Sequence, residues 1–163
     1  MSLQIGDQIP DLDVQVKQDG VIDAVNLREF AADKTIILFV VPGAFTPTCS
    51  AKHVPSYLAH YEALKAAGID AIACLSVNDA HVMDAWGTDQ QVGDKITMMA
   101  DISGDVAEAL GLKVYMGPIM GERAGRAAFV LKDGSFSHIF IEEPAVYQVS
   151  SAEHVLHHLS SEG

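Results

Sequence analysis

Two long apolar runs constrain the fold of this 163-residue chain more than any other feature of its sequence. Thr35 to Val41 and Ile69 to Val77 consist mainly of aliphatic residues, which is typical of strands covered on both faces. Between them, apolar residues recur at helical spacing and predict a helix from about Cys49 to Ala67, which Gly68 ends. Strand, helix and strand in this order indicate the α/β class.

The remaining segments extend this alternation in both directions. The sequence predicts a hairpin through Leu12, Val14 and Val16 with a turn at residues 18–20, a helix capped by Asn78 or Asp79, a strand from Ile96 to Ala100, a helix from Ser103 to Leu110, a loop from Met116 to Gly125, a hairpin of Arg126 to Leu131 and Phe136 to Ile141, and a last helix opened by a capping box at residues 150–153. This order predicts a thioredoxin-like fold, in which helices flank a central mixed sheet, with an N-terminal β-hairpin extension. No linker or repeat interrupts it, so residues 1–163 are predicted to form a single domain.

The charge balance excludes several classes of partner. The chain has 22 Asp and Glu against 10 Lys and Arg, which gives a net charge of −12 with His neutral. Nucleic acids and anionic membranes attract basic patches, so neither is expected as a partner. No apolar run approaches the roughly 20 residues of a membrane helix, and no signal-peptide pattern opens the sequence. The predicted location is cytoplasmic.

The chemistry depends on two cysteines, Cys49 and Cys74, because no CxxC pair and no zinc-ligand spacing occur. No metal and no cofactor are predicted. Cys49 ends the run PGAFTPTC, which begins at Pro42 just beyond a predicted central strand. In a thioredoxin-like arrangement redox cysteines lie at this point, where a helix begins. The unpaired N–H groups and dipole of a helix start would lower the pKa of a thiol there and favour the nucleophilic thiolate.

Several neighbouring residues suit a reacting thiolate. Thr46 brings a hydroxyl that can hold a peroxide oxygen or the thiolate. Pro42 and Pro47 stiffen the turn and remove N–H groups, which helps to shield the sulfur from water. A cationic side chain, from Arg126 or Arg123, would stabilise both the thiolate and the departing oxygen.

At these residues the chain resembles the peroxiredoxins. Pro42, Thr46 and Cys49 match the family's Pro-x-x-x-Thr-x-x-Cys motif, and Arg126 stands where its active-site arginine is expected. The longer run from Val41 to Pro55 is similar to the type II branch, as are the stretches Ala73 to Asp79, Phe129 to Gly134 and Val149 to Glu153. The resemblance implies a thioredoxin-like fold, reduction of hydrogen peroxide and alkyl hydroperoxides, antioxidant defence and redox homeostasis, and often a homodimer. Some members carry a resolving cysteine in the segment that is Tyr147 to Ser151 here, where this chain has none.

Other residues have simpler interpretations. Cys74 lies in the middle of a predicted strand and is expected to be a core residue, with a resolving or regulatory role as the alternative. His53 is expected on the surface, with a role as a base as the alternative. His154 and His158 are expected on an exposed helix face rather than on a metal. The loop from Gly117 to Gly125 is interpreted as a flexible connector, and Trp86 as a core residue.

The predicted mechanism has three steps. The Cys49 thiolate attacks the peroxide, Cys49 becomes a sulfenic acid, and external thiols reduce it. Glutathione with glutaredoxin, or thioredoxin, is the expected reductant. A thiol–disulfide oxidoreductase is disfavoured because Thr46 stands where a CxxC motif has its first cysteine. A non-catalytic peroxide sensor or holdase acting through Cys49 is the remaining alternative.

Overall fold

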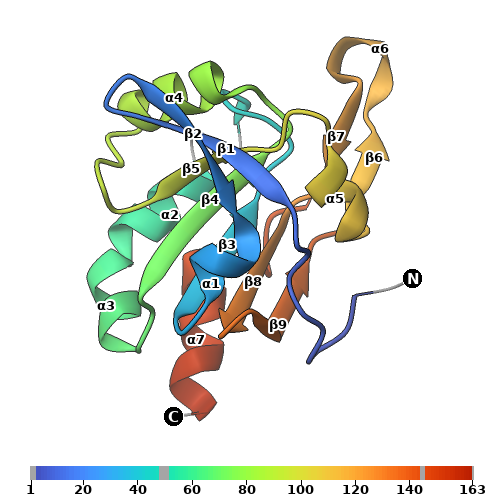
Figure 1. Cartoon of the computed structure of the whole chain (residues 1–163). Helices are drawn as coiled ribbons and strands as arrows, with labels where there is room; N and C mark the ends of the chain where they lie inside the picture. Colours follow the sequence, from blue (N-terminus) through green and yellow to red (C-terminus); the bar gives the residue numbers. More distant parts are fainter. Residues whose placement is uncertain (1–2, 48–51, 144–145, 163) are drawn as a thin grey trace.

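A seven-stranded mixed sheet forms the centre of the molecule in a computed structural model, which describes residues 3–47, 52–143 and 146–162 (Figure 1). Its strands lie in the order β2-β1-β5-β4-β3-β8-β9. They span Asp13–Gln18 (β1), Val21–Asn26 (β2), Thr35–Val40 (β3), Ala71–Ser76 (β4), Thr97–Ala100 (β5), Ala127–Lys132 (β8) and Ser135–Ile141 (β9). Strands β3, β4 and β5 are parallel, whereas the two predicted hairpins, β1–β2 and β8–β9, are antiparallel and extend the sheet on either side.

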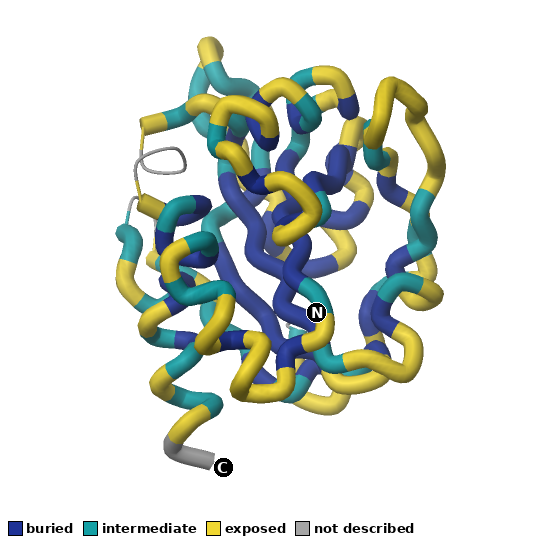
Figure 2. Tube along the Cα trace, turned by 90° about the vertical axis from the view of Figure 1, so that its left-hand side faces the viewer, coloured by how far each residue is buried: buried dark blue, intermediate teal, exposed yellow. Residues whose placement is uncertain are grey.

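Helices cover both faces of this sheet. The helices span Leu27–Ala31 (α1), Val54–Ala59 (α2), Tyr61–Ala66 (α3), Ala80–Asp89 (α4), Asp105–Ala109 (α5) and Ala152–Glu162 (α7). Ile37 and Phe39 of β3 pack with α2, α3, α4 and α7, while Ile36 and Leu38 pack with α1 and α5. Successive residues of β3 face opposite sides of the sheet because the side chains of a strand alternate. Since helices cover both sides, residues on both faces of the strand are apolar, which explains the apolar run in the sequence. Figure 2 shows the buried inner strands inside a layer of more exposed segments.

Two predicted features of the helices need correction. The predicted helix from Cys49 to Ala67 is divided at His60 into α2 and α3 over the part that is described, while residues 48–51 lie outside the described residues. At the start of α7, Ser151 rather than Ser150 provides the cap, because the Ser151 Oγ accepts from the His154 N–H at 3.2 Å. The Ser150 hydroxyl instead donates to the Glu142 carboxylate.

The prediction that residues 117–125 form a flexible connector is wrong. These residues belong to a small hairpin, in which β6 (Lys113–Tyr115) pairs with β7 (Glu122–Ala124) and the short helix α6 (Gly117–Met120) lies between the two strands. Figure 1 shows this hairpin projecting beside the main sheet. All three β6 residues are exposed, so no apolar alternation marked the strand in the sequence.

Candidate active site

Three segments meet at the carboxyl-terminal edge of the parallel strands. The segment after β3 contains Pro42 and Thr46, and Asn78 follows β4. Arg126 directly precedes β8, whose first residue Ala127 stands opposite Val40, the last residue of β3. The sheet therefore brings Arg126 to the edge where the Pro42–Thr46 loop begins. Cys49 lies outside the described residues.

The loop that leads toward Cys49 is held by specific hydrogen bonds. The Thr46 hydroxyl donates to the Gly43 carbonyl at 2.9 Å, which closes the turn. The Ala44 N–H donates to the Asn78 Oδ1 at 3.0 Å, and the Ser76 hydroxyl donates to the same oxygen at 2.8 Å. Phe45, which stands between Ala44 and Thr46 in the chain, has a φ of +64°, and 53% of the residue is exposed. A bulky residue held in the left-handed region indicates that the surrounding bonds fix this loop.

Arg123, one of the two arginine candidates, clamps backbone segments. Its Nε donates to the Met120 carbonyl at 2.8 Å and its Nη1 donates to the Val77 carbonyl at 3.0 Å. The guanidinium also lies against Gly43, where a Cβ would stand 3.3 Å from its Nη1. Arg123 thus joins the β6–β7 hairpin to the end of β4 and to the Gly43 turn.

Arg126, the other candidate, is held by a histidine. Its Nη1 lies 2.8 Å from His53 Nδ1, and its guanidinium carbon lies 5.9 Å from the centre of the Tyr147 ring. Because arginine can only donate, Nδ1 must accept, and the ring proton must be on Nε2. Nε2 then donates to the Ser150 carbonyl at 3.0 Å. Both ring nitrogens of His53 are therefore engaged, in a defined tautomer.

The expectation that His53 lies on the surface is wrong. The side chain is fully buried between Phe39, Tyr57 and Tyr147, whose ring centres lie 4.8, 5.7 and 5.2 Å away. Burial, and then the charge of Arg126, lower the pKa of His53 from 6.5 to about 3 although the Ser150 hydrogen bond raises it. The imidazole is therefore neutral at ordinary pH. Its spacing of four residues from Tyr57, on the apolar stripe of the helix, was the signal in the sequence.

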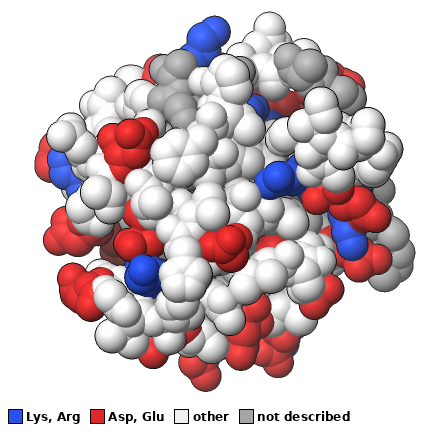
Figure 3. All heavy atoms as spheres, turned by 90° about the horizontal axis from the view of Figure 1, so that it is seen from above, with Lys and Arg blue, Asp and Glu red and all other residues white. Residues whose placement is uncertain are grey.

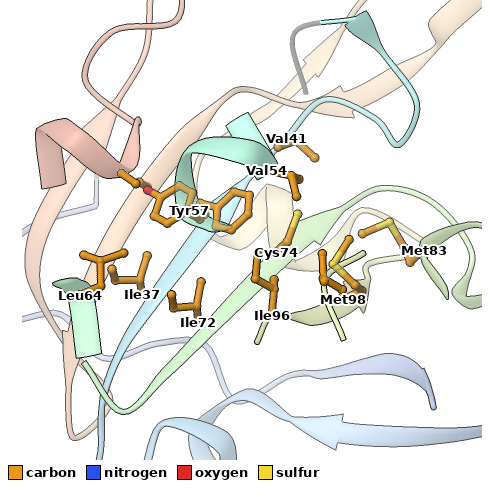
Figure 4. Close-up of a cluster of buried hydrophobic side chains, with 14 of the residues drawn as sticks. Ile37, Val41, Val54, Tyr57, Leu64, Ile72, Cys74, Met83, Ile96 and Met98 are labelled. Atoms are coloured by element: carbon orange, nitrogen blue, oxygen red, sulfur yellow. The ribbon is translucent and has the colours of Figure 1, made fainter. Parts of the chain in front are cut away.

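Cys74 is buried in the middle of β4, as its position in the sequence predicts. It stands opposite Phe39 of β3 and Met98 of β5. Figure 4 shows its side chain among core residues, close to Val54 and Met98 and directed toward the α2 side of the sheet. A rigid sheet on both sides limits how far this thiol can move.

The histidines of α7 lie on a half-buried face rather than on the exposed face that was expected. The rings of His154 and His158 are 4.4 Å apart, and each lies 5.0 Å from the Phe140 ring. Burial, followed by the charge of His158, lowers the pKa of His154. Over the described ranges, no three His, Cys, Asp or Glu side chains are grouped as a metal site would require.

A groove in the described part of the molecule lies elsewhere. It has a volume of about 720 Å³ and runs between β1, α4 and the segment that leads into β5. None of its lining residues belongs to the loop from Pro42 to Thr46, and Arg126 does not line it either. Pro42, Thr46 and Arg126 lie instead at the carboxyl-terminal edge of the parallel strands. In the described residues, no helix has the length and apolar character needed to span a membrane.

Comparison with known proteins defines the class of this fold and site. The Redoxin family matches residues 4–156. Peroxiredoxin-2D of Arabidopsis thaliana is 39% identical, and the match covers 94% of this chain and 96% of that protein. Chloroplastic Peroxiredoxin-2E of the same plant is also 39% identical, and the match covers 95% of this chain and 68% of that protein. The structure of reduced Prx3 in complex with H₂O₂ from Vibrio vulnificus superimposes with a TM-score of 0.93 at 37% identity, covering 96% of this chain and 99% of that one.

The fold is therefore thioredoxin-like, as predicted, and the protein is a thiol-dependent peroxidase. The chain belongs to the redoxin family and, within it, to the peroxiredoxins of the type II branch. A further structural relative, the Plasmodium falciparum antioxidant protein described as a 1-Cys peroxiredoxin, is 25% identical, has a TM-score of 0.91 and is covered over 99% of its length by 98% of this chain.

Proposed function

We propose that Cys49 is the nucleophile that reduces the peroxide, with Arg126, Thr46 and Pro42 forming its site. The observation that supports this most strongly is the position of Arg126. The pairing of Ala127 with Val40 brings this cation to the sheet edge from which the chain runs through Pro42 to Cys49. The neutral His53 orients the guanidinium without cancelling its positive charge, which can then act on a thiolate and on the departing oxygen.

The proposed reaction balances with no redox cofactor. The Cys49 thiolate attacks one peroxide oxygen, the O–O bond breaks, and the other oxygen leaves as hydroxide or alkoxide, which takes up a proton to give water or an alcohol. Cys49 is then a sulfenic acid. An external thiol condenses with it, releasing water and forming a mixed disulfide, and a second thiol reduces that disulfide and regenerates Cys49.

The reductant that we propose is glutathione with glutaredoxin, or thioredoxin. The segment from Tyr147 to Ser151 contains no cysteine, and Cys74, the second of the two cysteines in the sequence, is buried in the central sheet. A sulfenic acid at Cys49 therefore has to wait for an outside thiol. A resolving role for Cys74 is the alternative, and it would require β4 or its neighbours to open. The sensor or holdase hypothesis is not favoured, because the relatives are named peroxiredoxins and one of them was solved in complex with H₂O₂.

We further propose a single domain over residues 1–163, a cytoplasmic location and a homodimer. Exposed apolar side chains support the homodimer: Phe45 in the loop after β3, Ile102 before α5, Tyr115 of β6 and Ile119 of α6. From above, much of the surface carries neither acidic nor basic groups, and acidic side chains lie mainly toward its margin (Figure 3). Sedimentation of the reduced protein, with Phe45→Ser and Ile119→Ser as variants, tests this part of the proposal.

The experiment that tests the proposed chemistry is reaction with one equivalent of hydrogen peroxide, with and without glutathione, followed by mass spectrometry. We expect one added oxygen on Cys49 without glutathione and one glutathione on Cys49 with it. Cys49→Ser should show neither product and should have no peroxidase activity. Turnover by Cys49→Ser above a few per cent of the wild-type rate would refute the assignment.

A further inference from the structure

A closed ring of hydrogen bonds connects Arg126 to Glu142, the residue that follows β9. The Glu142 N–H donates to the Arg126 carbonyl at 3.0 Å, so the two residues are joined through their backbones. The Glu142 carboxylate continues the ring of hydrogen bonds toward the turn at residues 148–150. Its Oε2 accepts from the Gln148 N–H at 2.6 Å, from the Ser150 N–H at 2.9 Å and from the Ser150 hydroxyl at 2.7 Å.

The other half of the ring runs through Ser150 and His53. The Ser150 carbonyl accepts from His53 Nε2 at 3.0 Å and also from the Tyr57 hydroxyl at 2.7 Å. His53 Nδ1 accepts from the Arg126 guanidinium at 2.8 Å, which closes the ring. The turn at residues 148–150 thus has its N–H groups fixed by Glu142 and its carbonyl aimed at His53.

This arrangement controls which nitrogen of His53 carries the proton. A ring whose Nε2 proton is bound by the Ser150 carbonyl must offer a lone pair at Nδ1, and only that tautomer can accept from Arg126. If the Ser150 carbonyl turned away, the imidazole could rotate or change tautomer, and the guanidinium would lose this contact. The carboxylate of Glu142 fixes the N–H and the hydroxyl of Ser150, and with the Tyr57 hydroxyl, which donates to the carbonyl itself, it holds the Ser150 carbonyl in place.

We propose that His53 and Glu142 are positioning residues of the peroxidase site, acting through the Ser150 carbonyl to fix the orientation of the Arg126 guanidinium. The inference rests on the proposed function, in which Arg126 stabilises the reacting oxygens. It assigns a task to two residues whose contacts would otherwise be interpreted as a buried histidine and a capped turn. Electrostatic stabilisation depends on such preorganisation, and misplacement of a group by about 1 Å can slow a reaction about 100-fold.

The test compares two reactions of Cys49 in each variant, at a pH where the thiol is fully ionised. One is oxidation by hydrogen peroxide, which needs the guanidinium, and the other is alkylation by iodoacetamide, which does not. His53→Leu and Glu142→Ala should each lower the ratio of the two rate constants by about 10- to 100-fold. General loosening of the site would change both rates together and leave the ratio unchanged, which would overturn the proposal.

Conservative variants and matched controls sharpen this comparison. His53→Gln retains an acceptor and a donor and should recover most of the lost ratio. Ser150→Ala removes the hydroxyl but retains the carbonyl, so it should have a smaller effect than Glu142→Ala. Glu143→Ala makes the same charge change at the exposed neighbouring position and should leave the ratio at the wild-type value. If Glu142→Ala does not fold, Glu142→Met, which keeps the length of the side chain but has no oxygen to accept these bonds, decides: a lowered ratio supports the relay and a wild-type ratio overturns it.

A double-mutant cycle separates this inference from the proposed function. Because His53 and Glu142 act in series, the double variant should be no slower toward peroxide than His53→Leu alone, whereas independent effects would multiply. A wild-type rate for Arg126→Met would remove the proposed role of Arg126 and, with it, the basis of the relay. A slow Arg126→Met beside wild-type rates for both His53→Leu and Glu142→Ala would overturn the relay alone.

Discussion

At the scale of single residues, the two arginines at the sheet edge have different partners and therefore different tasks. Arg123 donates to the carbonyls of Val77 and Met120, which it holds together. Arg126 donates to a neutral imidazole. A carboxylate in place of His53 would neutralise the charge that the proposed reaction needs, whereas an uncharged acceptor orients the guanidinium without neutralising it.

Arg126→Met should therefore slow oxidation of Cys49 by about 10²- to 10³-fold, the usual cost of removing a preorganised donor. Stopped-flow measurement of sulfenic acid formation gives this rate. Lys132→Met, at the exposed far end of the same strand β8, is the matched control and should react at the wild-type rate. The melting temperature of Lys132→Met should stay close to that of the wild type, whereas Arg126→Met removes the donor to the buried His53 Nδ1 and should cost about 1–3 kcal/mol in stability. An Arg126→Met protein that is folded and reacts as fast as wild type contradicts the proposed role.

His53 also makes stability depend on pH. Its pKa is about 3 in the folded protein and near 6.5 when unfolded, so below pH 6.5 the unfolded chain binds a proton that the folded protein excludes. The free energy of unfolding should therefore fall by about 1.4 kcal/mol per pH unit on this account between pH 6.5 and about 3. Urea titrations of wild type and His53→Gln at pH 7 and pH 5 measure it. The difference in stability between the two proteins should shift in favour of His53→Gln at pH 5, and an unchanged difference would show that His53 is not buried and neutral.

At the scale of elements, two adjacent residues at the start of α4 have different tasks. Asn78 supports the loop from Pro42 to Thr46, and Asp79 caps α4. Asn78 accepts from the Ala44 N–H and from Ser76, and Asp79 accepts from the Val82 N–H at 2.9 Å. A substitution of Asn78 therefore tests the support of the loop, and a substitution of Asp79 tests the stability of the helix.

Asn78→Ala should slow the reaction of Cys49 with peroxide by about tenfold or more, because a displaced loop also displaces the cysteine to which it leads. It should also cost about 1–3 kcal/mol for the unsatisfied groups. Asp79→Ala removes the cap and should cost about 1 kcal/mol while leaving the rate unchanged. Peroxide kinetics and urea denaturation of both variants check these values. Equal rates for the two variants would mean that Asn78 does not support the loop.

The elements that could be predicted from sequence are those with a regular apolar pattern. Strands β3 and β4 and the β8–β9 hairpin were found because burial on one or two faces leaves a readable period. Helix α1 has five residues and the β6–β7 hairpin has three in each strand, too few for a period to be recognised. The buried partner of Arg126, His53, was missed because its neighbours in space, such as Ser150, come from distant parts of the sequence.

At the scale of the whole molecule, the position of Cys74 in the core bears on how the protein is recycled in the proposed mechanism. Cys74 belongs to the central strand β4 and packs in the core between two other strands. Opening that strand would disrupt the centre of the sheet, and we therefore propose that an outside thiol, rather than Cys74, reduces an oxidised Cys49.

Cys74→Ala should therefore keep most of its activity with glutathione and glutaredoxin, at a cost of about 1 kcal/mol in the free energy of unfolding for the smaller core side chain. Coupled oxidation of NADPH follows the turnover, with wild type as the reference. Loss of turnover in a folded Cys74→Ala variant, restored by no concentration of glutathione, would make Cys74 a participant in recycling.

The most direct test of the proposed mechanism is the mass of the reduced protein after one equivalent of hydrogen peroxide without added thiol. Because Cys49 is the one cysteine that reacts in this mechanism, we expect a gain of one oxygen, mapped by peptide analysis to Cys49, and no change in Cys49→Ser. A loss of two hydrogens with Cys49 linked to Cys74 would contradict recycling by outside thiols. Oxygen found on Cys74, with Cys49 unmodified, would contradict the central claim itself.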